Sequence, residues 1–328
     1  MLTLPLGAFP RMTELGARNR ALYPRPMSLG VVQTSAIAGI LDRVQRTVAI
    51  LERRGYAVTP GRLGELCVGG ALDGADVLDA VAASDRLLLR DGLVVSPRLS
   101  ATASAISRRA AAHAANAPRC LPLTLRFVRT LVRLCPYVLS VSIAGSLASG
   151  GYLTTDDVDL NLVVEDGYRH LAYVAVNLLG VAHALRHRGK PVDTHTRRPL
   201  APRFMTANLI LARSQCFPLA RQDEDMAYEF MASLPVYGIA LWSEVVATNP
   251  GLVAHFPQLD ERAFPLALRE RAAVPRWLFP AALDRPARRL GRAGWRFMQW
   301  TRRERPDALA RVAFVRQTMR PYALFDES

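Results

Sequence analysis

Apolar positions change their spacing several times along the chain, which predicts helices and strands within one molecule. Apolar residues recur every three to four positions from Ile37 to Leu51, and two shorter segments after Thr59 and Asp73 also have helical spacing. Two apolar runs then flank Asp91-Gly92, a dipeptide that favours a tight hairpin turn. Three helices followed by a hairpin is the element order of a winged helix.

The middle of the chain alternates between the two kinds of pattern. A helix is expected over 98–116, a joint at Pro118 and Pro122, and a second helix over 123–134. Strands are expected before Gly145, after Asp156 and over 204–212. Between the last two, a helix is expected with one buried stripe, formed by Leu171, Val174, Leu178, Val181 and Leu185. A further helix is expected from Glu224 to Leu234, where Pro235 breaks it.

These patterns predict an α+β protein with a small mixed sheet. Four regions are expected, namely an irregular arm at 1–33, a winged-helix-like domain at 34–118, a core at 119–250 and a basic helical region at 251–328. The third helix of the winged-helix-like domain carries Asp76 and Asp79 but no basic residue. That composition favours a structural, dimerising or lid role over the reading of DNA bases.

Candidate chemistry lies in the strand that begins near Asp157. Residues two apart on a strand share a face, so Asp157 and Asp159 are expected to project side by side. Adjacent carboxylates repel unless a cation lies between them, and Mg²⁺ often binds one or two carboxylates together with substrate phosphates. The preceding Gly145-Ser146 turn offers backbone N–H groups and a hydroxyl for a phosphate.

Gly145-Ser146 followed by Asp157-Val158-Asp159 resembles the nucleotidyltransferase superfamily typified by DNA polymerase beta. The resemblance implies a two-metal Mg²⁺ site at Asp157 and Asp159 and a triphosphate held by Gly145 and Ser146. It also implies transfer of an NMP from an NTP to an acceptor, with release of pyrophosphate. More loosely, the whole chain resembles uncharacterised bacterial proteins that carry a winged-helix-like region before such a domain.

The same resemblance implies a third carboxylate on a later strand. Asn208 occupies the position expected for it by strand order, and Asp193 lies on the loop that approaches this strand. Asn208 is expected to face Asp157 and Asp159, but an amide cannot accept a proton from an attacking hydroxyl. The alternative is therefore a non-catalytic nucleotide-binding or regulatory protein with a degenerate site.

The C-terminal region interleaves aromatic and basic residues. Trp277, Trp295, Phe297 and Trp300 alternate with arginines, which is typical either of a nucleic-acid surface or of an amphipathic helix that packs its aromatic side. The acceptor stays open between an RNA end and a small metabolite. The chain of 328 residues has a net charge of +14, although Lys190 is its single lysine.

The remaining features restrict the class of protein. The four cysteines are far apart and form no Cys-x-x-Cys, so reduced thiols and a cytoplasmic location are expected, without an integral membrane segment. His183, His187 and His195 are interleaved with arginines, which favours a solvated basic face over a zinc site.

Overall fold

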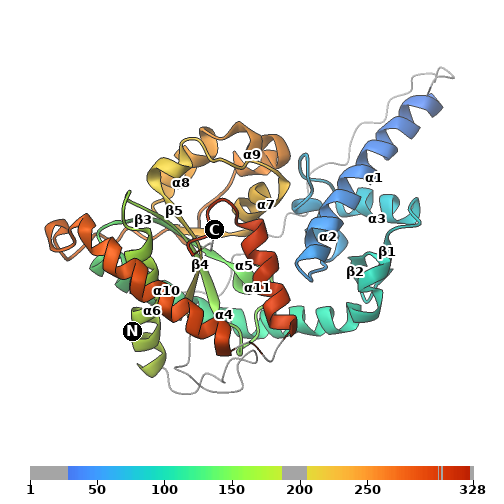
Figure 1. Ribbon diagram of the computed structural model, residues 1–328. Helices are drawn as coiled ribbons and strands as arrows, with labels where there is room; N and C mark the ends of the chain where they lie inside the picture. Colours follow the sequence, from blue (N-terminus) through green and yellow to red (C-terminus); the bar gives the residue numbers. More distant parts are fainter. Residues whose placement is uncertain (1–28, 187–204, 302, 304–305, 326–328) are drawn as a thin grey trace, which may run out of the picture.

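The computed structural model describes residues 29–186, 205–301, 303 and 306–325 of the chain. It has the expected mixture of helices and small sheets, an α+β fold. The N-terminal helices form a group at one side of the molecule, and the long helix α4 (Ala103–Leu134) runs from this group to the base of the larger sheet (Figure 1).

The N-terminal group has the predicted element order. Its elements are α1 (Leu29–Arg53), α2 (Pro60–Glu65), α3 (Gly74–Ala82), β1 (Leu88–Arg90) and β2 (Leu93–Val95). The side chain of Thr59 accepts a hydrogen bond from the backbone of Arg62 and so caps α2, while Pro60 takes the first helical position. Asp91 and Gly92 both have positive φ, 51° and 75°, as a tight hairpin turn requires. The arm was expected to extend to residue 33, which is wrong because α1 already includes 29–33.

No joint interrupts α4. The short helix η1 (Pro97–Thr102) leads into it, and α4 then continues through Pro118 and Pro122, so the predicted break is wrong. The two prolines are four residues apart and exposed, so both lie on the solvent side of the helix. The carbonyl groups that lose a helical partner there can bind water instead, which makes the prolines tolerable.

The larger sheet carries the candidate motif. Its strands are β3 (Val138–Ala144), β4 (Val158–Val164), β5 (Met205–Ala212) and β6 (Leu234–Tyr237), in the order β5-β4-β3-β6. A short helix, α5 (Gly145–Ser149), follows β3. Strand β4 is antiparallel to β3 and parallel to β5, which places Asp159 between Ala144 on one side and Thr206 on the other.

Strand β6 differs from the sequence prediction. Helix α7 (Glu224–Ala232) was expected to reach Leu234 and to be broken by Pro235, but the chain forms an edge strand that includes both residues. Proline is tolerated in an edge strand because one side of that strand needs no ladder hydrogen bonds. A proline in the sequence therefore indicates the end of a helix but does not exclude an edge strand.

The buried face of α6 (Arg169–Arg186) was also predicted wrongly. Its buried residues are small, namely Ala172, Val176, Gly180 and Ala184. Leu178 and Leu185 are 63% and 61% exposed. A Cβ at Gly180 would lie 3.0 Å from the carbonyl oxygen of Met205, so the small residues let α6 approach β5 more closely than leucines would allow.

The remaining helices follow β5 in the chain. They are η2 (Arg213–Cys216), α8 (Ile239–Ala247), α9 (Pro250–His255), η3 (Pro257–Leu259), η4 (Arg276–Leu278), η5 (Ala281–Leu283), α10 (Asp284–Thr301) and α11 (Pro306–Thr318). Among them, α10 packs on α6. Asp284 accepts hydrogen bonds of 2.8 Å from the backbone N–H groups of His170 and Leu171, which ties the start of α10 to the start of α6. No helix in the described ranges is long and apolar enough to cross a membrane.

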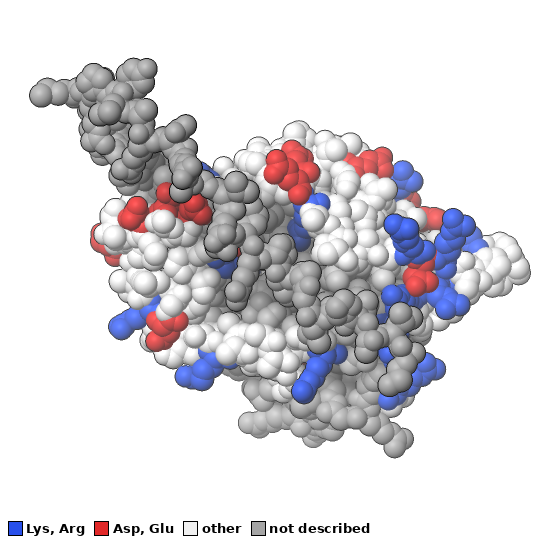
Figure 2. Space-filling view, turned by 180° about the vertical axis from the view of Figure 1, so that it is seen from behind, with Lys and Arg blue, Asp and Glu red and all other residues white. Residues whose placement is uncertain are grey.

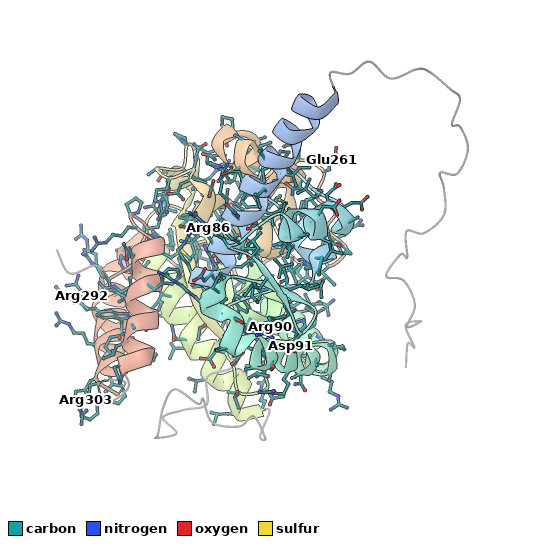
Figure 3. All side chains as sticks on the ribbon, turned by 90° about the vertical axis from the view of Figure 1, so that its right-hand side faces the viewer. Arg86, Arg90, Asp91, Glu261, Arg292 and Arg303 are labelled. Carbon is teal, nitrogen blue, oxygen red and sulfur yellow. The ribbon has the colours of Figure 1, made fainter. Side chains whose placement is uncertain are left out.

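Charged side chains are distributed unevenly over the surface. Seen from behind, basic residues gather along one edge of the protein, while the rest of that face carries scattered charges of both signs (Figure 2). Arg303, just beyond α10, points away from the body of the molecule (Figure 3). We call the exposed side of α10, which includes Phe297 and Trp300, its outer side. Other residues of α10 pack on α6.

Candidate functional site

The turn between β3 and α5 is fitted directly against the second carboxylate of the motif. Gly145 has a φ of +61°, and a Cβ at this position would lie 2.0 Å from Oδ2 of Asp159. Both the backbone conformation and the contact require glycine. Because Asp159 is paired with Ala144 across the sheet, the register of β3 and β4 fixes the distance between the turn and the carboxylate.

Asp157 and Asp159 line the same cavity. Asp157 immediately precedes β4 and lines a cavity of about 360 Å³ together with Asp159 and the buried Ser146. The hydroxyl of Thr206 on β5 donates a hydrogen bond of 2.8 Å to Oδ1 of Asp159. A hydroxyl therefore lies on β5 directly beside the motif.

Asn208 lies in the same cavity as Asp157 and Asp159, but its amide contacts other groups. Its Nδ2 donates to Oδ1 of Asn161 and to Oε1 of Glu229, at 3.1 Å in both cases. The other candidate for the third position, Asp193, lies outside the described residues. On the described strands, β5 thus contributes a hydroxyl and an amide to the cavity.

Glu229 is a carboxylate that the sequence analysis missed. It comes from α7, and its Oε1 also accepts a hydrogen bond of 3.3 Å from Nδ2 of Asn161. Burial raises the pKa of Glu229 above its ordinary value, against the opposing effects of Arg54 and of the two amides. The available signal was an acidic residue between two large apolar neighbours, Tyr228 and Phe230, at the centre of a predicted helix.

A second cavity, of about 440 Å³, lies between the end of α1 and the sheet. Glu229 and Gly145 line it, and Asp159, Asn208 and Met319 line both cavities, so the two spaces meet beside the second carboxylate. On the α1 side, Arg53 and Arg54 are held by Asp225 at 3.0 Å and 2.8 Å. Burial opposes ionisation of Asp225, but the hydrogen bonds from the two arginines outweigh it and lower the pKa of its carboxyl group.

Two residues of α4 hold the loop between α5 and β4. Arg109 bonds the carboxylate of Asp156 and the carbonyl oxygen of Gly151. One turn further on, Nδ1 of His113 accepts a hydrogen bond of 3.1 Å from the backbone N–H of Tyr152. Burial lowers the pKa of His113, which favours the neutral ring that this bond requires.

The opposite wall of the first cavity is built by helices. It includes Tyr173 and Asn177 from α6, Trp295 from α10, Arg316 from α11, and Phe325. The guanidinium of Arg316 lies 4.9 Å from the ring centre of Trp295. Trp295 thus packs inward, as one of the two interpretations of the tail predicted. Trp300 is 51% exposed on the outer side, with Arg303 over its ring at 4.2 Å.

The oxygen ligands in the cavity suit a hard cation. Two carboxylates and a hydroxyl are the groups that Mg²⁺ accepts, with substrate phosphates completing its coordination. In the described part of the chain, no cluster of three or more His, Cys, Asp or Glu residues could hold a metal ion by itself. His183 was expected on a solvated face, which is wrong because its ring packs edge-on against Phe127 at 5.6 Å. His187 and His195 lie outside the described residues.

Comparison of the chain with protein-family models, with curated proteins and with solved structures finds no match.

Proposed function

We propose that the protein is a Mg²⁺-dependent nucleotidyltransferase. The observation that carries the proposal is the close fit of Gly145 against Asp159, which lines one cavity together with Asp157 and Ser146. This arrangement places a turn suited to phosphate beside two carboxylates suited to Mg²⁺. Bound Mg²⁺ would neutralise charge that develops on the phosphates. Asp157 and Asp159 would hold the cation, and Thr206 would fix the orientation of the Asp159 carboxylate.

The second cavity is suited to the acceptor because it meets the first at Asp159 and Asn208. An acceptor hydroxyl would attack the α-phosphorus of the NTP, forming a new P–O bond while the bond to pyrophosphate breaks. Glu229 would take the proton of that hydroxyl, since a carboxylate with a raised pKa is a better base near neutral pH. An RNA end and a small metabolite both remain as acceptors.

A second candidate function is nucleotide binding without transfer. It is favoured by the side chains of β5, where Thr206 and Asn208 offer a hydroxyl and an amide instead of the third carboxylate that the resemblance to nucleotidyltransferases implies. Under this alternative, Glu229 would serve only to order the amides of Asn161 and Asn208.

Calorimetric titration with Mg²⁺ and each of the four common NTPs tests the site. Asp157→Asn and Asp159→Asn are expected to abolish Mg²⁺-dependent binding with little loss of fold stability, while Asp260→Asn, which removes an exposed carboxylate elsewhere, leaves it unchanged. Undiminished binding in both site variants would refute the proposal. Pyrophosphate release by the wild type separates the two functions, because the binding protein would bind nucleotide and release none.

A further inference from the structure

Asn177 presents an unsatisfied acceptor at the first cavity. Its Nδ2 donates a hydrogen bond of 2.7 Å to the carbonyl oxygen of Tyr173, one turn earlier on α6. A carbonyl oxygen can only accept, so this bond fixes which end of the amide is which. Oδ1 is buried and has no hydrogen-bond partner among the described residues, although Asn177 lines the cavity. A buried acceptor without a donor costs free energy, which a ligand with an N–H group would recover.

Aromatic rings line the same cavity as this acceptor. The ring centres of Tyr173 and Phe325 are 5.0 Å apart, and those of Trp295 and Phe325 are 6.4 Å apart. Gly291 allows the cluster to form, because a Cβ there would lie 2.8 Å from Cζ of Phe325 and 3.1 Å from Cδ1 of Tyr173. The result is a wall of flat apolar surface with one hydrogen-bonding amide in it.

This wall and the carboxylates belong to one cavity of about 360 Å³, within the usual range for small-molecule sites. A ligand that fills it needs an anionic end beside Asp157 and Asp159, bridged by a cation, and a flat end carrying an N–H donor beside Asn177. Nucleotides combine these two ends. Stacking on aromatic rings and hydrogen bonding to one amide are the usual means of holding a nucleobase.

We propose that the base of the nucleotide binds to the helical wall, with Asn177 as its hydrogen-bonding residue and Trp295 as its stacking surface. The inference rests on the proposed function, since the phosphates are assigned to the Gly145 turn. Oδ1 of Asn177 accepts a hydrogen bond from the base, and the second hydrogen on Nδ2 donates to a neighbouring acceptor of the base. The aromatic rings exclude water from both bonds.

The experiment compares two probes on the full chain, inorganic tripolyphosphate and the four NTPs, each with Mg²⁺ and measured by calorimetry. The wild type is expected to bind at least one NTP roughly tenfold to a hundredfold more tightly than tripolyphosphate, the range that base stacking provides. Asn177→Leu and Trp295→Leu are each expected to reduce this advantage at least about fivefold and to leave tripolyphosphate affinity unchanged. Leu178→Ala, on the exposed side of the same helix, is the matched control.

Thermal unfolding keeps the test independent of activity. Asn177→Leu removes a buried unsatisfied oxygen, so its Tm is expected to be equal to or above that of the wild type. If tripolyphosphate binds but no NTP binds more tightly, or if the variants weaken both probes equally, the base subsite is refuted and the phosphate site stands. If neither probe binds the wild type, the proposed function fails as well.

Discussion

The two walls of the first cavity are built by different means. On the sheet wall, Asp159 and Thr206 are placed by the register of neighbouring strands, which also sets the Gly145 turn against Asp159, so these positions follow from backbone hydrogen bonds. On the helical wall, Trp295 and Phe325 come from segments far along the chain and are placed by side-chain packing. Backbone register allows little adjustment, whereas packed side chains can rearrange. Substitutions on the sheet wall should therefore have the larger effects.

The largest effect is expected for Gly145→Ala. The new Cβ would lie 2.0 Å from Oδ2 of Asp159 while the residue keeps a φ of +61°. We expect loss of Mg²⁺-dependent nucleotide binding and a decrease of about 2–5 kcal/mol in the free energy of unfolding. Calorimetry and denaturant titration measure the two quantities.

Gly150→Ala provides the matched control. Gly150 also has a positive φ, +87°, but no atom lies within 4 Å of the position of its Cβ. In Gly150→Ala, the free energy of unfolding should decrease only by the cost of the positive φ, about 1–2 kcal/mol, and nucleotide binding should be kept. Equal losses in the two variants would show that strain alone, and not the contact with Asp159, makes Gly145 necessary.

Glu229→Gln is expected to have the next largest effect, on catalysis alone. A glutamine oxygen can still accept from Asn161 and Asn208, so the fold and nucleotide affinity should be retained. Pyrophosphate release should fall by about 10²–10⁴-fold, the usual contribution of a general base. Since burial raises the pKa of Glu229, the wild-type rate should rise with pH through that pKa, and this rise should vanish in the variant.

The control for Glu229 is Glu244→Gln, which changes an exposed acid on α8 and should leave the rate unchanged. A Glu229→Gln protein that releases pyrophosphate at the wild-type rate, with the same pH profile, would assign Glu229 a structural role. Release by neither protein, with nucleotide still bound, would favour the non-catalytic alternative.

A smaller, pH-dependent effect is expected from His113, which supports the sheet wall from outside. Burial lowers its pKa, so folding favours the neutral ring. The contribution of His113 to the free energy of unfolding is complete above the ordinary pKa of 6.5. It is lost as the pH falls through the lower pKa of the folded state. Protonated Nδ1 cannot accept from Tyr152, and the affinity for Mg²⁺-nucleotide should weaken about threefold to tenfold in acid.

His113→Phe removes the acceptor at every pH. This variant should bind nucleotide more weakly near neutrality and should lose the component of acid dependence that is due to His113, whereas His255→Gln should retain it. An unchanged pH profile in His113→Phe would contradict the role assigned to the bond with Tyr152.

The sheet wall was also the more predictable one, for the same physical reason. The glycine and carboxylates of the motif lie in one turn and one strand, so their spacing along the chain predicts where they lie. The Thr59 cap and the Asp91-Gly92 hairpin also depend on residues close together in the sequence. The missed features depend on contacts between distant residues. Arg109 reaches a residue 47 positions away, and Asn208 reaches Glu229 across 21.

The errors on α4, α6 and β6 have a common origin. In each case the prediction used only neighbouring residues in the sequence, and the surroundings of the segment in the folded protein changed the result. Exposure to water makes Pro118 tolerable in a helix, and the edge of the sheet admits Pro235. The close approach of β5 selects small residues over leucines on α6, as Gly180 demonstrates. None of these partners is visible in the spacing of apolar positions alone.

The smallest effect is expected on the outer side of α10, where aromatic residues face solvent. Trp300→Ala should change the free energy of unfolding by less than about 0.5 kcal/mol, whereas Trp295→Ala, on the inner side, should cost about 2 kcal/mol. Deleting the whole tail would not distinguish these sides, because it also removes the buried Tyr322 and Phe325. Titrating both variants with single-stranded RNA at several salt concentrations tests the nucleic-acid interpretation. Phosphate contacts would give affinity that falls steeply with salt and is weaker in Trp300→Ala, and absent or salt-independent binding would count against an RNA acceptor.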